Sequence, residues 1–416
     1  MRRRFLALGA AVAALVAAVA GAALVARLGP GAPGGAAGPA GRPPEPDLAA
    51  PAPGPSLAVG ITEFNPNLVS ATAALPQPWA RWRDALGALH PAVFRLVIDW
   101  ANLQPDRGKP PNLSLRNGGC TRTVPPCLAW EGLRDQLRAL ATRQRQGGWQ
   151  GLAVITGTPT WAGVRAAPCA RDAPGSARAP RIDALADYRR LIDDVIQLSS
   201  REGADLRYWS AWNEPNHPSF LAPPCAIPAA AVYGELVRAL RGALAGAPRG
   251  PQLVLGETSG LLVRRARRTP VQDFIAELPA DVACESHVWD QHAYIGGADP
   301  VPAVESALAR RRCPHAWVLW VTETGVGAAP PSLSGAAELH DERQGCTLLH
   351  ARLVRWWHDP HVRLAVQYTF REDPEFRTGL ISADMSRARP ALAEWMAWGG
   401  RRSPGAPAPA SACPKA

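Results

Sequence analysis

The chain has 416 residues, and its 45 Lys and Arg exceed its 35 Asp and Glu to give a formal net charge of +10 at pH 7. The excess comes from scattered Arg rather than one basic block, so the composition argues against a nucleic acid partner. We interpret the charge as a source of solubility or of attraction to an anionic envelope. The composition does not indicate an oligomeric state.

The N-terminus has the pattern of an export signal. Three Arg follow Met1 and precede an uncharged run of 22 residues, 5–26, which is long enough to span a bilayer. Residues 18–20 read Ala-Val-Ala, which is typical of a cleavage site. We therefore expect residues 1–28 to be a signal-anchor or a cleaved signal peptide. Either one predicts an exported protein, anchored in the cell membrane with an extracytoplasmic domain or secreted.

Two segments of low complexity flank a single large region. Residues 29–56 are almost entirely Gly, Pro and Ala, which predicts a disordered linker, and residues 401–416 have a similar composition that predicts a flexible tail. We expect residues 57–400 to form one domain, because no second break of this kind interrupts them.

Within that domain, short apolar runs alternate with amphipathic segments. Eight runs predict strands: LAVGI from 57, VFRLVI from 93, LAVIT from 152, LRYWSAW from 206, QLVLG from 252, SHVWDQHAY from 286, AWVLWVT from 316 and VRLAVQYTF from 362. Residues 184–200 and 229–246 repeat apolar residues at helical spacing. Buried strands separated by helices indicate an α/β fold with a parallel sheet, and eight units favour a (β/α)8 barrel. A doubly wound sheet is the alternative, but no G-x-G-x-x-G follows the first strand.

The chemistry of such a barrel lies at the carboxyl ends of its strands. The residues at or just after those ends are Glu63, Arg95, Trp100, Trp161, Asn213, Glu214, Glu257, His292, Tyr294, Glu323 and Tyr368. They predict a polar and aromatic mouth above an apolar barrel.

Two of these residues are carboxylates that close different strands. Glu214 lies in YWSAWNEPN, after the fourth strand, and Glu323 lies in WVTETGVG, after the seventh. Because the barrel is closed, the two side chains can face each other across its mouth. Two facing carboxylates are the equipment of glycoside hydrolysis: one protonates the leaving oxygen, while the other attacks the anomeric carbon or activates water.

The motifs WNEPN and TETG resemble those of the clan A glycoside hydrolases, retaining enzymes built on this barrel, and the resemblance covers about 57–400. It implies that Glu214 is the acid/base and Glu323 the nucleophile. GTPTWA, which contains Trp161, is similar to the third-strand motif of the β-xylosidase and α-L-iduronidase-like branch.

The same resemblance implies a substrate-binding set. Asn213 would bind the sugar 2-hydroxyl, Arg95 would steady the nucleophile as an anion, and His292 and Tyr294 would lie near both carboxylates. Many members carry a Trp at the end of the eighth strand, where this sequence has Tyr368 and Phe370. We expect Trp100, Trp161 and Tyr368 to contact the sugar, although each Trp could equally be a core residue.

Other interpretations remain open. Glu63 and Glu257 are expected to support the catalytic groups or to lie at the rim. HVWDQH suggests a metal site of His287, Asp290 and His292, but alternation along a strand places His287 on the opposite face, so neither a metal nor a cofactor is expected. A metal-dependent hydrolase and a glycan-binding barrel without catalysis are the alternatives to a glycosidase.

Eight cysteines in an exported chain predict disulfides. From their order along the barrel we expect four pairs: Cys120 with Cys127, Cys169 with Cys225, Cys284 with Cys313, and Cys346 with Cys413. Eight cysteines allow 105 connectivities, so the order of the residues alone proves none of these pairs.

Overall fold

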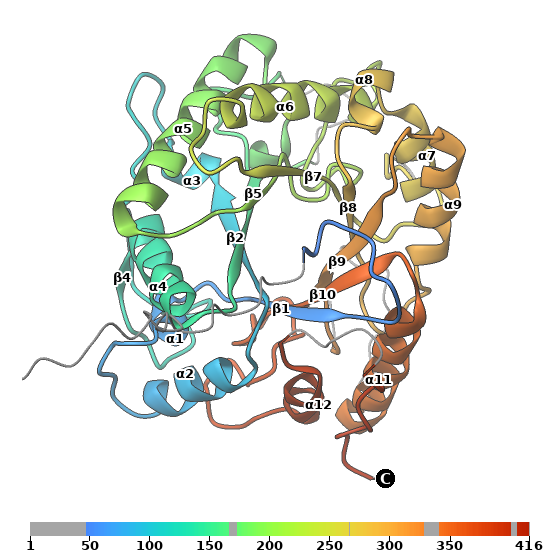
Figure 1. Ribbon diagram of the computed structural model, residues 1–416. Helices are drawn as coiled ribbons and strands as arrows, with labels where there is room; N and C mark the ends of the chain where they lie inside the picture. Colours follow the sequence, from blue (N-terminus) through green and yellow to red (C-terminus); the bar gives the residue numbers. More distant parts are fainter. Residues whose placement is uncertain (1–46, 166–172, 266, 328–340, 401–405, 416) are drawn as a thin grey trace, which may run out of the picture. The chain divides into compact units, whose positions relative to one another are not determined.

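The computed structural model describes residues 47–165, 173–265, 267–327, 341–400 and 406–415. Eight parallel strands form a closed barrel in the order β1-β10-β9-β8-β7-β6-β5-β2 (Figure 1). The strands are β1 (Ala58–Thr62), β2 (Val93–Asp99), β5 (Gln150–Thr156), β6 (Tyr208–Ser210), β7 (Gln252–Thr258), β8 (Val288–His292), β9 (Val318–Thr324) and β10 (Val362–Tyr368). Each one falls within or overlaps a predicted run, so the (β/α)8 prediction is confirmed.

Helices connect consecutive strands around the outside of the barrel (Figure 1). The longer ones are α2 (Trp79–Ala88), α4 (Gly132–Gln146), α5 (Leu185–Glu202), α6 (Ala229–Leu244), α7 (Val271–Glu277), α9 (Val301–Arg311), α11 (Glu342–His358) and α12 (Pro390–Trp398). The shorter elements are α1 (Pro66–Val69), α3 (Trp100–Leu103), α8 (Ala280–Ala283), the hairpin strands β3 (Arg116–Asn117) and β4 (Trp130–Glu131), and two 3-10 turns, Gly175–Ala177 and Ile182–Ala184.

Helix α5 shows how the sequence sets these elements. Its buried residues include Tyr188, Leu191, Ile192 and Val195, which recur at three- and four-residue steps and face the barrel. The helix ends where Gly203 adopts a left-handed conformation, with φ of 76°, that other residues rarely adopt. The predicted helix over 184–200 is therefore confirmed, and so is the second one, as α6.

A packed apolar cluster fills the interior of the barrel beneath the carboxyl ends of its strands. Inward-facing residues of all eight strands form it, among them Val93, Leu152, Tyr208, Trp320 and Leu364. Tyr208 meets Trp320 edge to face, with ring centroids 4.6 Å apart. Because this interior is solid, the polar side chains at the strand ends rest on a rigid floor.

The predicted linker and tail lie partly in the described part of the chain. Of residues 29–56, the structure describes 47–56, where Leu48 and Ala49 are buried against the barrel interior and Leu48 O accepts a hydrogen bond from Trp320 Nε1 at 3.1 Å. Of residues 401–416, it describes 406–415, where Ala408 packs against the core. The packed unit therefore includes residues beyond 57–400.

Three of the predicted disulfides are confirmed. Cys120 pairs with Cys127, Cys284 with Cys313 and Cys346 with Cys413, at Cα–Cα distances of 4.3, 5.3 and 5.7 Å. The fourth pairing, of Cys169 with Cys225, stays a prediction, because Cys169 lies outside the described residues.

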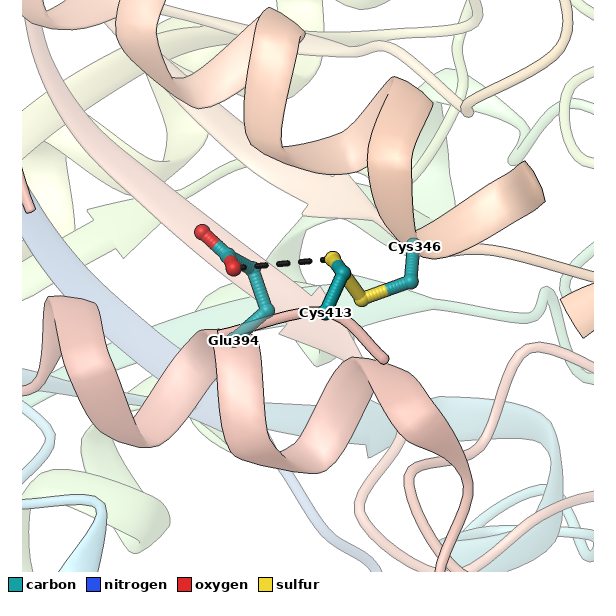
Figure 2. A group of neighbouring side chains, drawn as sticks. All are labelled: Cys346, Glu394 and Cys413. Atoms are coloured by element: carbon teal, nitrogen blue, oxygen red, sulfur yellow. Dashed lines mark hydrogen bonds between the residues drawn. A yellow bond between two sulfur atoms is a disulfide. The ribbon is translucent and has the colours of Figure 1, made fainter. Parts of the chain in front are cut away.

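The Cys346–Cys413 bridge ties the C-terminal segment to α11, and Glu394 of α12 lies beside it (Figure 2). Glu394 is buried, and its Oε1 faces His350 Nδ1 at 2.8 Å and accepts from Trp398 Nε1 at 2.7 Å. Its Oε2 accepts from Ala412 N at 2.8 Å. The same oxygen lies 3.6 Å from Cys413 Sγ, which has no proton to donate because it is in a disulfide. The Glu394 carboxylate thus contacts α11, α12 and the C-terminal segment.

No helix in the described ranges is long and apolar enough to cross a membrane. The predicted signal-anchor or signal peptide, residues 1–28, lies outside those ranges and stays a prediction.

Replacing Cys346 and Cys413 together by Ala should lower the free energy of unfolding by about 2 kcal/mol more than replacing Cys120 and Cys127 by Ala. The reason is loop length, since the first bridge closes a separation of 67 residues and the second a separation of 7. Denaturant unfolding of both double variants measures the difference. An equal loss in the two variants would contradict the expectation.

Candidate active site

The segment after β6 places an amide and a carboxylate at the barrel mouth. Beyond Ser210 the backbone still bonds to both neighbouring strands: Asn213 N donates to Ile155 O at 2.9 Å, and Glu214 N donates to Glu257 O at 2.8 Å. Pro215 follows and has no N–H to extend this pattern. The apolar run therefore ends in polar residues because the two neighbouring strands hold them at the mouth.

Glu214 and Glu257 both have unusual backbone conformations. Their φ values are 43° and 48°, a left-handed region that costs a non-glycine residue about 1–3 kcal/mol. Gly256, with φ of 118°, precedes Glu257, and a Cβ there would lie 2.2 Å from Asp290 O. Strain of this kind persists only where the surrounding structure over-determines it, and it is common at functional sites.

Arg95 of β2, inside the barrel, contacts three of the site residues: Asn213, Glu257 and Glu323. Its Nη2 lies 2.5 Å from Glu257 Oε2 and donates to Asn213 Oδ1 at 2.8 Å, while its Nε donates to Glu257 Oε1 at 3.1 Å. Its Nη1 forms an ion pair with Glu323 Oε1 at 2.8 Å. Arg95 is fully buried, so its charge is compensated entirely by these neighbours.

His292, at the end of β8, lies among three carboxylates. Its Nδ1 is 2.9 Å from Glu214 Oε1 and 3.3 Å from Glu323 Oε2, and its Nε2 is 2.7 Å from Glu257 Oε2. Burial alone would lower the pKa of His292, but the negative charge of Glu323 and hydrogen bonds to Glu214 and Glu257 raise it to about 10. The ring is therefore a cation at neutral pH and donates from both nitrogens.

The carboxylates around this cation differ in pKa. Burial would raise the pKa of Glu257, but Arg95 and His292 outweigh it and hold that pKa well below the usual range. Burial raises the pKa of Glu214, and the charge of Glu323 adds to this increase, against the hydrogen bond from His292. The pKa values of two buried carboxyl groups in one site are therefore shifted in opposite directions.

Glu323, at the end of β9, is contacted on both oxygens, by an ion pair on one and a hydrogen bond on the other. Arg95 approaches Oε1, and Tyr294 donates its hydroxyl to Oε2 at 2.6 Å. Glu214 is less engaged: its Oε1 meets His292, while its buried Oε2 has no hydrogen-bond partner in the described part of the chain. A ligand in the mouth could supply that partner.

The structure brings together Arg95, Asn213, Glu214, His292, Tyr294 and Glu323, as the sequence predicts. Tyr368 ends β10 beside them, half-buried, with Phe376 at 5.4 Å and Phe64 at 6.0 Å between ring centroids. Trp161 is also half-buried, and its Nε1 donates to Gln104 O at 2.9 Å. Both rings keep some exposed surface.

The expectation that Trp100 contacts a sugar is wrong. Asp99 caps the short helix α3 by accepting from Asn102 N at 3.1 Å, and the Trp100 side chain is fully buried there, against Trp161 and Tyr188. It has no exposed face on which a sugar could stack. Trp212 is likewise a core residue.

Glu63 and Glu257 support other groups, as expected. Glu63 accepts from Asn65 N and Arg371 N, both at 2.8 Å, and burial raises its pKa to about 7. It lines a hollow of about 520 Å³ that also includes Tyr368. Glu257 is fully buried and bridges Arg95 and His292, so the rim position is excluded.

Asn216 was missed by the sequence analysis, although it belongs to the WNEPN motif. Its side chain is buried, donates to Ser259 O and Thr269 O at 3.0 Å each, and accepts from Ser259 N at 2.8 Å. It therefore joins both ends of the loop between β7 and α7 to the segment that carries Glu214.

The metal site proposed for HVWDQH is not formed. His287 is exposed and its ring contacts that of His315 at a tilt, whereas Asp290 and His292 are buried. Glu214, His292 and Glu323 do lie close enough to share an ion, but both nitrogens of His292 are engaged and the ring is cationic. Cys346, Glu394 and Cys413 form another close group, whose sulfurs are joined in a disulfide (Figure 2). Neither group offers a free ligand set.

No protein-family model matches the sequence, and no curated protein is significantly similar to it. Solved structures are similar in fold. A family 39 glycoside hydrolase from Bacteroides cellulosilyticus is 15% identical, with TM-score 0.50 over 85% of this chain and 64% of that one. A glycoside hydrolase family 30 endoxylanase from Clostridium papyrosolvens is 12% identical, with TM-score 0.50 over 83% and 72%. A glucosidase from Croceicoccus marinus is 11% identical, with TM-score 0.54 over 85% and 69%.

The chain thus shares the barrel of glycoside hydrolases of families 30 and 39, as the resemblance of its motifs predicts. At these identities the likeness concerns the fold, and the chemistry has to be argued from the site.

The charge on His292 should make stability depend on pH. Its pKa is about 10 in the folded protein and about 6.5 in an unfolded chain, so the stabilisation is complete below 6.5 and is lost as the pH rises toward 10. Between about pH 7 and 10 the free energy of unfolding should therefore fall more steeply in the unmodified protein than in a His292→Asn variant. Thermal or denaturant unfolding across this range measures both slopes, and parallel slopes would show that the ring is not charged.

Proposed function

We propose that the protein is an exported glycosidase that hydrolyses O-glycosidic bonds of an oligo- or polysaccharide with retention of configuration. Glu214 is the acid/base and Glu323 the nucleophile. The observation that carries this proposal is the pair itself: an oxygen of Glu214 lies within 4.8 Å of an oxygen of Glu323, at the mouth of a barrel shared with glycoside hydrolases.

The separation supports retention. In retaining glycosidases the two carboxyl groups lie about 5–5.5 Å apart, so that one can bond directly to the anomeric carbon. Inverting enzymes need about 6.5–9.5 Å to admit a water molecule between carboxylate and sugar. The oxygen-to-oxygen distance of at most 4.8 Å between Glu214 and Glu323 favours direct attack.

The surroundings of the two groups divide their roles. Glu323 faces Arg95, His292 and the Tyr294 hydroxyl, which together stabilise an anion, as a nucleophile requires. Glu214 has a raised pKa and one oxygen without a partner among the described residues, so it can keep a proton for the glycosidic oxygen.

In the first step Glu323 attacks the anomeric carbon while Glu214 gives its proton to the departing oxygen, which leaves a glycosyl ester on Glu323. The negative charge of Glu323 is thereby lost, and the raised pKa of Glu214 falls, since its like-charged neighbour is gone. Glu214 then takes a proton from water, which attacks the ester and frees both the sugar and Glu323.

Asn213 has an orientation suited to the substrate. Its Oδ1 accepts from Arg95 Nη2 at 2.8 Å, which fixes the amide and leaves the N–H₂ group for a sugar hydroxyl. A barrel that binds glycans without catalysis would not need both carboxylates in such different environments. Three disulfides support export, because such bridges persist in oxidising compartments.

The two carboxylates should respond differently to substitution. Glu323→Ala should lower kcat/KM for every glycoside by about 10⁴-fold or more, because no ester can form. Glu214→Ala should lower it by about 10²–10⁴-fold for alkyl glycosides but much less for the first step with nitrophenyl glycosides, whose leaving group needs no proton. Steady-state and burst kinetics measure this.

Glu235→Gln, on the exposed face of α6, is the matched control and should change nothing. Equal losses of the first step in both catalytic variants with nitrophenyl glycosides would overturn the division of roles.

The pH profile should report Glu214. Activity needs this group protonated, so the alkaline limb of kcat/KM should lie above the usual pKa of a glutamic acid, in the direction in which burial and Glu323 shift it. In Glu214→Ala, assayed by the burst of a nitrophenyl glycoside, this limb should disappear. An alkaline limb that persists unchanged in the variant would assign the proton to another group.

A further inference from the structure

Strand β7 carries one extra residue at the barrel mouth. Leu255 pairs with Trp289 of β8 and Thr258 pairs with Gln291, so β7 advances three residues where β8 advances two. A bulge of this kind takes backbone groups out of the ladder and changes the direction of a side chain, and bulges are common beside active sites. Glu257 lies within this one.

Two side chains accept the backbone N–H groups of the bulge. Gly256 N donates to the hydroxyl oxygen of Tyr233, from α6, at 2.8 Å. Glu257 N donates to Oδ1 of Asp290, from β8. Both acceptors are fully buried, in surroundings where an N–H without a partner is costly. The bulge therefore depends on the side chains of Tyr233 and Asp290 rather than on the ladder.

The bulge fixes the direction of the Glu257 side chain. With φ of 48°, this residue brings its Oε2 to 2.5 Å from Arg95 Nη2 and to 2.7 Å from His292 Nε2. The N–H that Asp290 accepts belongs to the same residue. A change in the backbone at Glu257 would therefore change the contact between its carboxylate and the His292 ring.

The second oxygen of Asp290 bears on the charge of this residue. Asp290 Oδ2 is buried and has no hydrogen-bond partner among the residues that the structure describes. Glu257 from β7, His292 from β8 and Tyr233 from α6 are titratable groups that face Asp290. Burial raises the pKa of Asp290 well above its usual range, and the charge of Glu257 adds to this, while the Glu257 N–H and His292 act against it. Both observations favour a neutral acid, because a buried charge without a partner is very costly.

We propose that Asp290 is a positioning residue of the active site: as a neutral acid it accepts the N–H of Glu257 and, together with Tyr233, holds the Glu257 carboxylate against His292. The hydrogen bond to Glu257 is one of the interactions that raise the pKa of His292. Asp290 thus acts on the charge of the ring without touching it. The effect of this role on turnover rests on the proposed glycosidase function, whereas its effect on His292 does not.

Thr258, the next residue of β7, offers a matched control. Its Oγ1 donates to Gln291 Oε1 at 2.6 Å, and both residues are buried. Thr258→Val therefore removes a buried side-chain bond between β7 and β8 without removing an acceptor of Glu257.

Nuclear magnetic resonance of the protein with ¹⁵N-labelled histidine measures the pKa of His292, and the His292→Asn variant identifies its signals. In Asp290→Ala this pKa should fall by about 1 or more from its value of about 10, because a released Glu257 carboxylate no longer holds the ring. Asp290→Asn keeps a neutral acceptor of the same shape, so its His292 pKa should stay close to that of the unmodified protein, as should that of the control Thr258→Val.

Two results would overturn the proposal. One is a His292 pKa that does not change in Asp290→Ala. The other is a fall in Asp290→Asn as large as that in Asp290→Ala, which would show that Asp290 acts through a negative charge.

Tyr233→Phe keeps the proposal testable if Asp290→Ala does not fold. This variant removes the acceptor of Gly256 N and keeps the ring that packs against Phe274. The pKa of His292 should fall in the same direction as in Asp290→Ala, by a smaller amount. If Asp290→Ala does not fold, an unchanged pKa in Tyr233→Phe would overturn the proposal.

Kinetics separate this proposal from the proposed function. With a nitrophenyl glycoside that the protein hydrolyses, Asp290→Ala should lower kcat about tenfold and change KM less than about twofold, and Asp290→Asn should recover most of the loss. A loss confined to KM would count against the proposal. A lowered His292 pKa without hydrolysis of any glycoside would retain the positioning role and reject the glycosidase. Hydrolysis with an unchanged His292 pKa in Asp290→Ala would retain the glycosidase and reject the positioning role.

Discussion

The site depends on one buried cation, the His292 ring, which contacts three carboxyl groups at once. Without its charge, Glu214, Glu257 and Glu323 would be three acids in a water-poor barrel mouth with Arg95 as their main counter-charge. With it, two cations face Glu257 and Glu323. The pKa of the third acid, Glu214, is raised by burial and by the charge of Glu323, and His292 acts against that rise. Balanced charge is what makes so many buried ionisable groups tolerable, because an unpaired buried charge is far more costly than a paired one. The pKa of Glu214 thus depends on several groups of the network rather than on one neighbour.

The barrel supplies the rigidity that this network requires. The apolar cluster inside the barrel is packed, so the side chains of the network cannot move into the interior. The backbone hydrogen bond from Glu214 N to Glu257 O links the two residues that have left-handed φ. A residue with left-handed φ points its side chain differently from an ordinary strand residue. Here Glu257 lies within β7 and Glu214 lies in the segment that follows the neighbouring strand β6. The cost of that strain is small beside the packing of a barrel of this size, and it is offset by the contacts that the network makes.

The sequence predicted the barrel and the groups at the strand ends because both follow from local patterns. Eight apolar runs are visible by eye, and in a parallel barrel the end of every run lies at the same rim. Arg95, Asn213, His292, Tyr294 and the carboxyl pair were found in this way. The sugar contact predicted for Trp100 was wrong, because the burial of this side chain depends on the Asp99 cap and on rings from two other segments. The bridging role of Glu257 depends on the register shift around Gly256, and that of Asn216 on a loop 43 residues away, so no local pattern reports either one.

The most direct test is to trap the intermediate. The protein would be incubated with a fluorinated derivative of a glycoside that it hydrolyses, which slows release of the sugar from the enzyme, and then digested and mapped by mass spectrometry. We expect one added sugar per chain, in ester linkage to Glu323, and none on Glu323→Gln. A sugar attached to Glu214, or turnover that gives the inverted anomer with no labelled peptide, would contradict it.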